Sequence, residues 1–160
     1  MARGLERLDQ HLQQSQYDSQ DWAGGLGAEL AVETIAELSQ EEWGALQRMV
    51  PARAANWRAC LASVLRPQLG EGASKLLIQL SADQEIDVAF AALRGVAFYC
   101  GVNHSASGPF LSARTVVPEF LQLAKETDGL SENIKRVSAQ CHPYFQRELG
   151  LLVGVLTNGP

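Results

Sequence analysis

The chain has 160 residues, 46% of them hydrophobic, and carries 13 lysines and arginines against 18 aspartates and glutamates, for a net charge of −5. This length and apolar content suit one domain with a buried core, and the acidic balance disfavours nucleic-acid binding, which depends on clustered cations. The apolar residues are mainly Leu and Ala, which favour helix over strand. We therefore expect a single all-α domain over residues 1–160.

The amino-terminal residues are charged and are followed by glutamines, so no apolar core of a secretion signal is visible. The longest apolar stretches, Val96–Cys100 and Leu149–Leu156, are shorter than the roughly 20 residues that span a bilayer. The odd set Cys60, Cys100 and Cys141 argues against a disulfide framework. These features predict a cytoplasmic protein, outside the membrane, with reduced cysteines in its core.

Two helices are predicted in the first 38 residues by apolar side chains at three- and four-residue spacing. The first extends from about Ala2 to Gln14. The second follows a polar break, and glycines weaken its start. Its expected buried stripe is Trp22, Leu26, Leu30, Ile35 and Leu38.

A third, short helix is predicted to begin at Ser39–Glu42, where a hydroxyl residue and a glutamate three positions later can cap each other's backbone N–H groups. Pro51 ends it, and the next helix carries Trp57 and Leu61 until Pro67. A further helix is expected around Leu76–Leu80.

The strongest helical pattern of the chain covers Glu85 to about Tyr99. Asp83, Glu85 and Asp87 lie at its start, where acids are favoured by the helix dipole. We interpret them as capping and dipole residues; contact with a basic partner is the alternative, and catalysis is a weaker one.

The segment Asn103–Pro109 is predicted to be a polar loop between helices. Phe110–Glu126 is predicted to be helical with an interruption near Pro118, and two final helices are expected to begin at Ser131 and Pro143. Such short helices with short connections favour stacked helix pairs, as an α-solenoid or an irregular helical bundle.

Three stretches carry a resemblance to a known family: Trp57–Ala62, Ala73–Leu80 and Asp83–Arg94, with Leu38–Trp43 upstream. A Leu-rich helix, a short acidic turn and a second helix that opens with Val and Ala resemble a HEAT-type repeat, as in the small HEAT-like immunity proteins that bacteria encode beside polymorphic toxins. The resemblance covers residues 38–97. It implies a HEAT-like fold and a protein that binds and neutralises a cognate toxin.

The chain lacks the motifs of phosphate-binding loops, zinc proteases, paired-cysteine sites and nucleophile elbows, so we expect no enzyme and no cofactor. Cys100, His104, Cys141 and His142 include the residue types of a zinc site. Burial of the cysteines and helix-end positions for the histidines are the preferred interpretation.

The acidic residues are concentrated in residues 1–50, which hold nine acids and three bases and therefore a net charge of −6, against +1 for the rest of the chain. This asymmetry predicts an acidic surface that faces a basic protein partner. Tyr17 and Trp22 flank the glycine-rich part of this segment and are candidate aromatic anchors. The predicted partner-binding residues are Tyr17, Asp18, Asp21, Trp22, Glu41, Glu42, Asp83, Glu85 and Asp87.

These observations lead to an expected function as an immunity protein that binds a basic, cytoplasm-acting toxin domain, of which a nucleic-acid-directed toxin is the favoured kind. The alternative is a helical adaptor or a secretion-associated chaperone. A DNA-glycosylase-type enzyme on a HEAT-like scaffold would need a basic groove, which the charge balance does not offer.

Overall fold

The computed structural model describes residues 3–105 and 107–158 and consists mainly of short α-helices. The predicted all-α class is confirmed, and the first helix begins at Arg3, whereas the predicted start at Ala2 lies outside the described residues. The α-helices are α1 (Arg3–Gln14), α2 (Gln20–Ala23), α3 (Gly27–Ala36), α4 (Gln40–Met49), α5 (Ala55–Val64), α6 (Glu71–Leu80), α7 (Ile86–Tyr99), α8 (Pro118–Glu126), α9 (Leu130–Ser138) and α10 (Pro143–Asn158). Short 3-10 helices are η1 (Val50–Ala52), η2 (Pro67–Leu69) and η3 (Ala113–Thr115).

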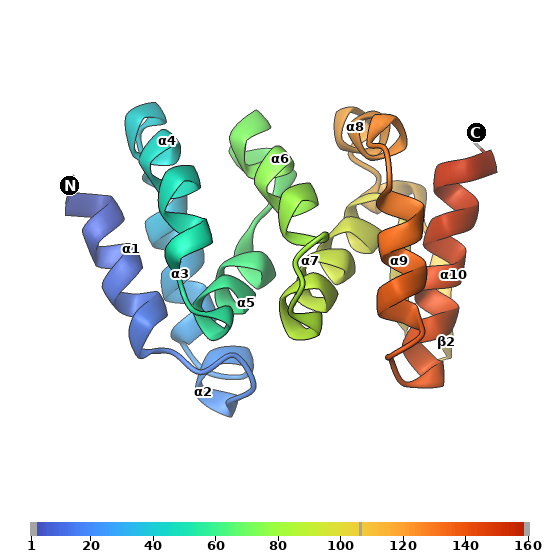
Figure 1. Ribbon diagram of the computed structural model, residues 1–160, viewed down its shortest axis with the longest axis horizontal. Coiled ribbons are helices and arrows are strands. Elements are labelled where there is room, and N and C mark those ends of the chain that lie inside the picture. Colours follow the sequence, from blue (N-terminus) through green and yellow to red (C-terminus); the bar gives the residue numbers. More distant parts are fainter. Residues whose placement is uncertain (1–2, 106, 159–160) are drawn as a thin grey trace.

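The helices are arranged along the longest axis of the molecule, with α1 at one end, α5 and α7 near the middle and α10 at the other end (Figure 1). Helices α4, α6 and α8 line one long edge. Helix α3 packs on α1, α5 packs extensively on α7, and α7 also packs on the preceding α6. The predicted stacking of short helices is therefore present, with α7 at its centre.

The hydrophobic core runs through this stack and is supplied mostly by Leu, Ala and Val side chains. Helix α7 is buried on most of its circumference, because Val88, Ala91 and Ala92 are buried together with Ala89, Leu93 and Val96. A helix that is apolar on nearly all sides is covered by neighbours on nearly all sides. This agrees with its central position.

Local sequence signals account for several helix starts. Ser39 Oγ accepts the N–H of Glu42 while the Glu42 carboxylate accepts the N–H of Ser39, so the predicted capping box is confirmed. Pro118 and Pro143 occupy the first positions of α8 and α10. The predicted cap at Ser131 is wrong, because α9 begins one residue earlier, after Gly129 in a left-handed conformation.

The segment after α7 differs from the prediction of a loop followed by a helix. Strands β1 (Val102–Ser105) and β2 (Gly108–Leu111) form an antiparallel hairpin in which Val102 pairs with Leu111. Gly108 has a φ of 117°, which an L side chain adopts only with strain, and it allows the tight reversal. After the short η3, α-helix begins only at Pro118, and Val117 stays extended because the residue before a proline is disfavoured in helical geometry.

Among the described helices, none combines the length and the apolar content that crossing a bilayer requires.

Candidate functional site

An acidic surface lies on the amino-terminal side of the molecule and is formed by the segment that leads into α2 and by α3. Asp18, Asp21, Glu29, Glu33 and Glu37 are exposed there. Within residues 3–105 and 107–158, none of these five carboxylates belongs to an ion pair. Their negative charge is therefore not compensated by neighbouring cations.

Two leucines stand exposed within this acidic region. The exposed fraction is 69% for Leu26 and 47% for Leu30. The N–H of Leu30 donates to the carbonyl of Leu26 at 2.9 Å, so the two residues lie one helical turn apart on the same side of α3. Glu29 and Glu33 flank Leu30 on the same exposed face by helical spacing. We call Asp21, Leu26, Glu29, Leu30 and Glu33 the α3 surface.

The α3 surface borders a hollow of about 500 Å³ between α1, α2 and α3. Asp21, Leu26 and Leu30 line it together with His11, whose Nε2 lies 2.7 Å from the carbonyl oxygen of Gly27. The two leucines thus give the hollow an apolar side, and Asp21 adds an acid to its lining.

Two glycines bring α2 and α3 close enough together to form this surface. A Cβ at Gly25 would lie 2.8 Å from the carbonyl oxygen of Asp21, and one at Gly27 would lie 2.9 Å from the same atom. Ser19 accepts the N–H of Trp22 and so caps α2. The sharp turn after α2 therefore requires residues without a side chain at Gly25 and Gly27, and α2 itself is capped by Ser19.

The two aromatic residues predicted as anchors in this region are buried or half-buried in the structure. Trp22 is only 3% exposed, and its Nε1–H donates to Ser63 Oγ at 3.0 Å, so its ring is a core contact between α2 and α5. Tyr17 is half-buried, its N–H donates to Asn56 Oδ1, and burial raises the pKa of its hydroxyl. Neither aromatic ring is an exposed anchor of the acidic region.

Leu26 and Leu30 are exposed, although the sequence predicted them to be buried. They were predicted to be buried with Trp22 on one continuous helix, but the chain turns at Gly24–Leu26 and α3 starts in a new orientation. The cluster Gly24, Gly25 and Gly27 was the signal for this break, because glycines at that density interrupt a helix and reset its apolar phase.

Glu41 and Glu42 have different environments. Glu41 is exposed in the first turn of α4. Glu42 is held by the capping box and its Oε2 also accepts the N–H of Leu5 at 2.7 Å, so backbone hydrogen bonds from Ser39 and Leu5 lower the pKa of Glu42. Glu42 therefore joins α4 to α1, and Glu41 remains available for contact.

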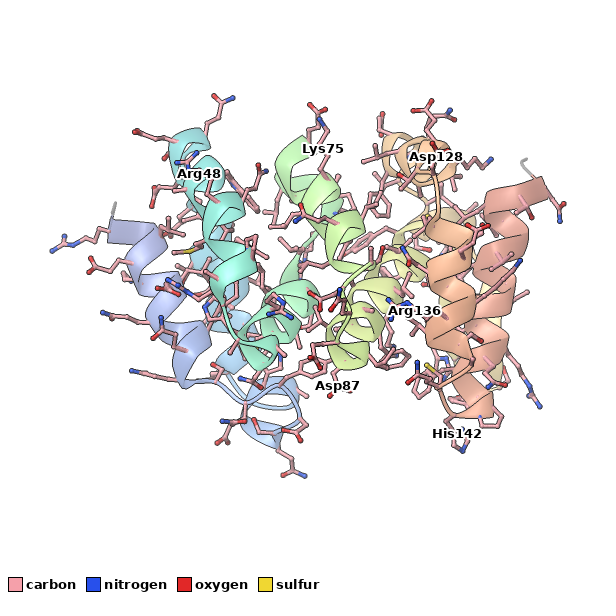
Figure 2. The ribbon with its side chains drawn as sticks, in the orientation of Figure 1. Arg48, Lys75, Asp87, Asp128, Arg136 and His142 are labelled. Carbon is pink, nitrogen blue, oxygen red and sulfur yellow. The ribbon has the colours of Figure 1, made fainter. Side chains whose placement is uncertain are left out.

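The acidic turn before α7 is partly neutralised. Asp83 receives two hydrogen bonds from Arg58, at 2.8 and 3.0 Å, and its backbone carbonyl accepts one from Arg136 on α9. Burial raises the pKa of Asp83, but the hydrogen bonds from Arg58 and from the backbone N–H of Glu85, together with the charges of Arg58 and Arg136, lower it below the ordinary value. Glu85, which immediately precedes α7, is exposed. Asp87 is exposed in the first turn of α7 (Figure 2). Asp83 thus forms an intramolecular ion pair, whereas Glu85 and Asp87 do not among the described residues, and the predicted partner contact of all three stays a prediction.

The cysteines and histidines do not gather into a metal or nucleophilic site in the described residues. Burial raises the pKa of Cys60 and of Cys100 to about 12, which keeps both as neutral thiols at physiological pH. His142 is exposed at the start of α10 (Figure 2). His104 lies instead beside Glu148, with 3.0 Å between Nδ1 and Oε2.

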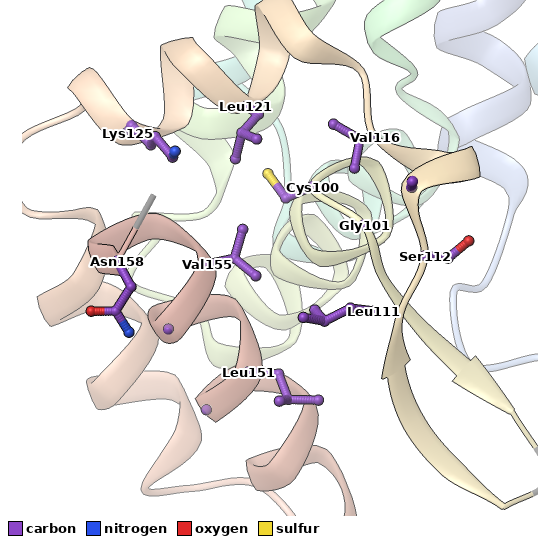
Figure 3. A pocket seen from close by; sticks show the side chains of 13 residues that line it. Cys100, Gly101, Leu111, Ser112, Val116, Leu121, Lys125, Leu151, Val155 and Asn158 are labelled. Atoms are coloured by element: carbon purple, nitrogen blue, oxygen red, sulfur yellow. The ribbon is translucent and has the colours of Figure 1, made fainter. Parts of the chain in front are cut away.

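An apolar hollow of about 570 Å³ lies at the other end of the molecule, between β2, α8 and α10. Leu121, Cys100 and Val155 point toward one another across it, with Lys125 at its border (Figure 3). It contains few polar groups to orient a ligand, and we do not assign a function to it.

Comparison of the chain with protein-family models, with curated proteins and with solved structures finds no match. The case for function therefore rests on the residues of this chain.

Proposed function

We propose that the protein binds a basic protein partner through the α3 surface and inhibits it, as an immunity protein inhibits its cognate toxin. One observation carries this proposal: the exposed pair Leu26 and Leu30 is surrounded by acids without partners among the described residues. The resemblance of residues 38–97 to HEAT-like immunity proteins supports the finer assignment to toxin inhibition.

The two kinds of side chain would have separate roles in the complex. Leu26 and Leu30 supply apolar area, whose removal from water contributes roughly 25 cal/mol per Å² before the costs of association. The carboxylates at the border supply long-range attraction to a positively charged surface, which raises the association rate and selects against acidic partners. A toxin that acts on nucleic acid is the favoured partner because such proteins expose basic surfaces.

The experiment is co-expression with the product of the neighbouring reading frame, which the immunity proposal requires to be toxic in the cytoplasm. The unchanged chain is expected to restore growth. Leu30→Asp and the double variant Glu29→Lys/Glu33→Lys are expected to abolish protection, since each removes one component of the α3 surface.

Two control variants match these changes at the far end of the molecule. Leu111→Asp places the same charge at an exposed leucine of β2, and Asp128→Lys reverses an exposed acid in the turn before α9 (Figure 2). Both are expected to protect as well as the unchanged chain. A neighbour that is harmless in the cytoplasm contradicts the toxin assignment, and full protection by Leu30→Asp contradicts the assigned surface.

A further inference from the structure

A second, polar pocket lies between the carboxyl-terminal part of α5, the helix α7, strand β1 and α10, and has a volume of about 310 Å³. It is distinct from the α3 surface and shares no residue with it. Its polar lining is supplied by residues from separate parts of the chain: Tyr17, Ser63, Arg66, Arg94, Tyr99, His104 and Glu148. The sequence analysis gave no reason to group these residues.

Both arginines of this pocket have guanidinium donors without acceptors. In the part of the chain that the structure describes, neither Arg66 nor Arg94 makes an ion pair or a side-chain hydrogen bond. The Arg94 guanidinium lies over the Phe145 ring at 5.2 Å and over the Phe90 ring at 6.0 Å. Such stacking uses the face of the guanidinium and leaves its in-plane N–H groups for an acceptor.

The third element of the pocket is a histidine that a buried carboxylate holds in place. Glu148 is only 4% exposed, and its Oε2 lies 3.0 Å from His104 Nδ1. The His104 ring also packs edge-on against Tyr144, with 4.4 Å between ring centroids. A carboxylate at Nδ1 favours the proton on that nitrogen and leaves Nε2 as the second polar atom of the ring. Nε2 has no hydrogen-bond partner among the described residues.

The Glu148 charge is already engaged by His104, so the two arginines leave the pocket with an excess of positive charge. This contrasts with the net charge of −5 of the whole chain. Two forked guanidinium groups suit an anion with several oxygens, since each fork can hold two of them. Phe98, which is exposed at the border of the pocket, adds an apolar surface beside the cations.

We propose that this pocket binds a phosphomonoester attached to an organic ring. Arg66 and Arg94 hold the phosphoryl oxygens, His104 contributes Nε2 as a further polar contact, and Phe98 packs against the ring of the ligand. The volume of about 310 Å³ lies at the lower end of the roughly 300–1,000 Å³ that pockets for small organic ligands occupy, which suits a ligand of about a single ring with its phosphate.

The test is a titration of the full chain with phenyl phosphate and, as the second probe, with inorganic phosphate. Binding is measured by calorimetry and by the NMR signals of the His104 ring. Saturable binding with a roughly millimolar dissociation constant is expected for phenyl phosphate, and weaker binding for inorganic phosphate. Arg66→Gln and Arg94→Gln are each expected to weaken binding roughly tenfold or more. Arg94→Lys, which keeps the charge and removes the fork, should give an intermediate loss.

Arg147→Gln is the matched control, because Arg147 is exposed on α10 next to Glu148 and does not line the pocket. Its affinity for phenyl phosphate should equal that of the unchanged chain. Circular dichroism of every variant checks that the fold is kept. Absence of saturable binding at roughly 10 mM phenyl phosphate, or binding that both Arg66→Gln and Arg94→Gln leave unchanged, would overturn the proposal. Equal affinity for the two probes would overturn the assigned contact with Phe98.

Discussion

At the residue scale, the acids of this chain divide into those that join helices and those that face outward. Asp9 is 8% exposed and accepts hydrogen bonds from Arg53 at 2.9 and 2.7 Å and from Trp57 Nε1 at 3.0 Å. It therefore fixes α1 to the start of α5. Asp18, nine residues later, is exposed and without an ion pair among the described residues. From composition alone, Asp9 and Asp18 are both counted in the acidic excess of residues 1–50.

Replacing Asp9 by Asn should destabilise the protein in a pH-dependent way. The hydrogen bonds from Arg53 lower the pKa of Asp9 below its ordinary value of 3.8. A lowered pKa in the folded state means that the carboxylate stabilises the fold above the ordinary value and loses this effect as the pH falls below it. We expect a loss of about 2 kcal/mol at pH 7 for Asp9→Asn.

Urea unfolding at pH 7, 4 and 3 measures this difference, which should shrink as the pH is lowered. Asp18→Asn is the control and should leave the free energy of unfolding unchanged at pH 7. A difference between the unchanged chain and Asp9→Asn that is the same at every pH would show that the Asp9 charge does not contribute.

At the element scale, helices whose signals are local were predicted well and the elements that depend on distant contacts were not. The capping box at Ser39 and Glu42 lies within four residues, so the sequence alone identifies the start of α4. The hairpin of β1 and β2 is stabilised by its contacts with α7 and α10, which no local pattern reveals. Its polar, glycine-containing sequence therefore indicated a loop.

Ser39→Ala should lower the free energy of unfolding by about 1 kcal/mol, because it removes the acceptor for the N–H of Glu42. For a chain of this size, that loss corresponds to a melting temperature about 2–4 °C lower. Ser131→Ala is the matched control, since Ser131 lies in the first turn of α9 without being its cap. Equal thermal shifts in the two variants would be inconsistent with a capping role for Ser39.

Alanine substitutions at two glycines should have opposite effects. Gly101 has a φ of 93°, and a Cβ there would lie 2.8 Å from Val116 Cγ2, so Gly101→Ala should cost about 1–3 kcal/mol. Gly150 is exposed within α10 and has open space around it, so Gly150→Ala should stabilise the protein by about 0.5–1 kcal/mol. Thermal melts of both variants measure this contrast, and a stabilised Gly101→Ala variant would contradict the described turn after α7.

At the scale of the whole molecule, the acidic and the cationic features lie in different regions. The α3 surface belongs to the first helices, whereas the polar pocket with Arg66 and Arg94 is built mainly from α5, α7, β1 and α10, with Tyr17 as its one lining residue from the first part of the chain. The charge asymmetry between residues 1–50 and the rest of the chain correctly indicated exposed acids in the first part. It could not indicate the pocket, because Arg94 and Glu148 come together only through the packing of α7 and α10.

The sequence also could not show which acids form ion pairs within the chain. Asp83 meets Arg58 and Arg136 only when α5, α7 and α9 are stacked, so its ion pair could not be read from the sequence. Leu26 and Leu30 were predicted to be buried because one continuous helix was expected where the chain turns at Gly24–Leu26. The acidic character of the surface was thus predictable, and its apolar centre was not.

The most direct test of the α3 surface is the association rate of the protein with the proposed toxin partner, measured by stopped-flow as a function of ionic strength. Attraction between opposite charges is screened within about 10 Å at 0.1 M salt and about 3 Å at 1 M, so the rate should fall steeply as salt increases. The Glu29→Lys/Glu33→Lys variant should associate slowly with little salt dependence, and Asp128→Lys should behave like the unchanged chain. A rate that does not depend on salt, or one that Asp128→Lys lowers as much as Glu29→Lys/Glu33→Lys does, would contradict binding through this surface.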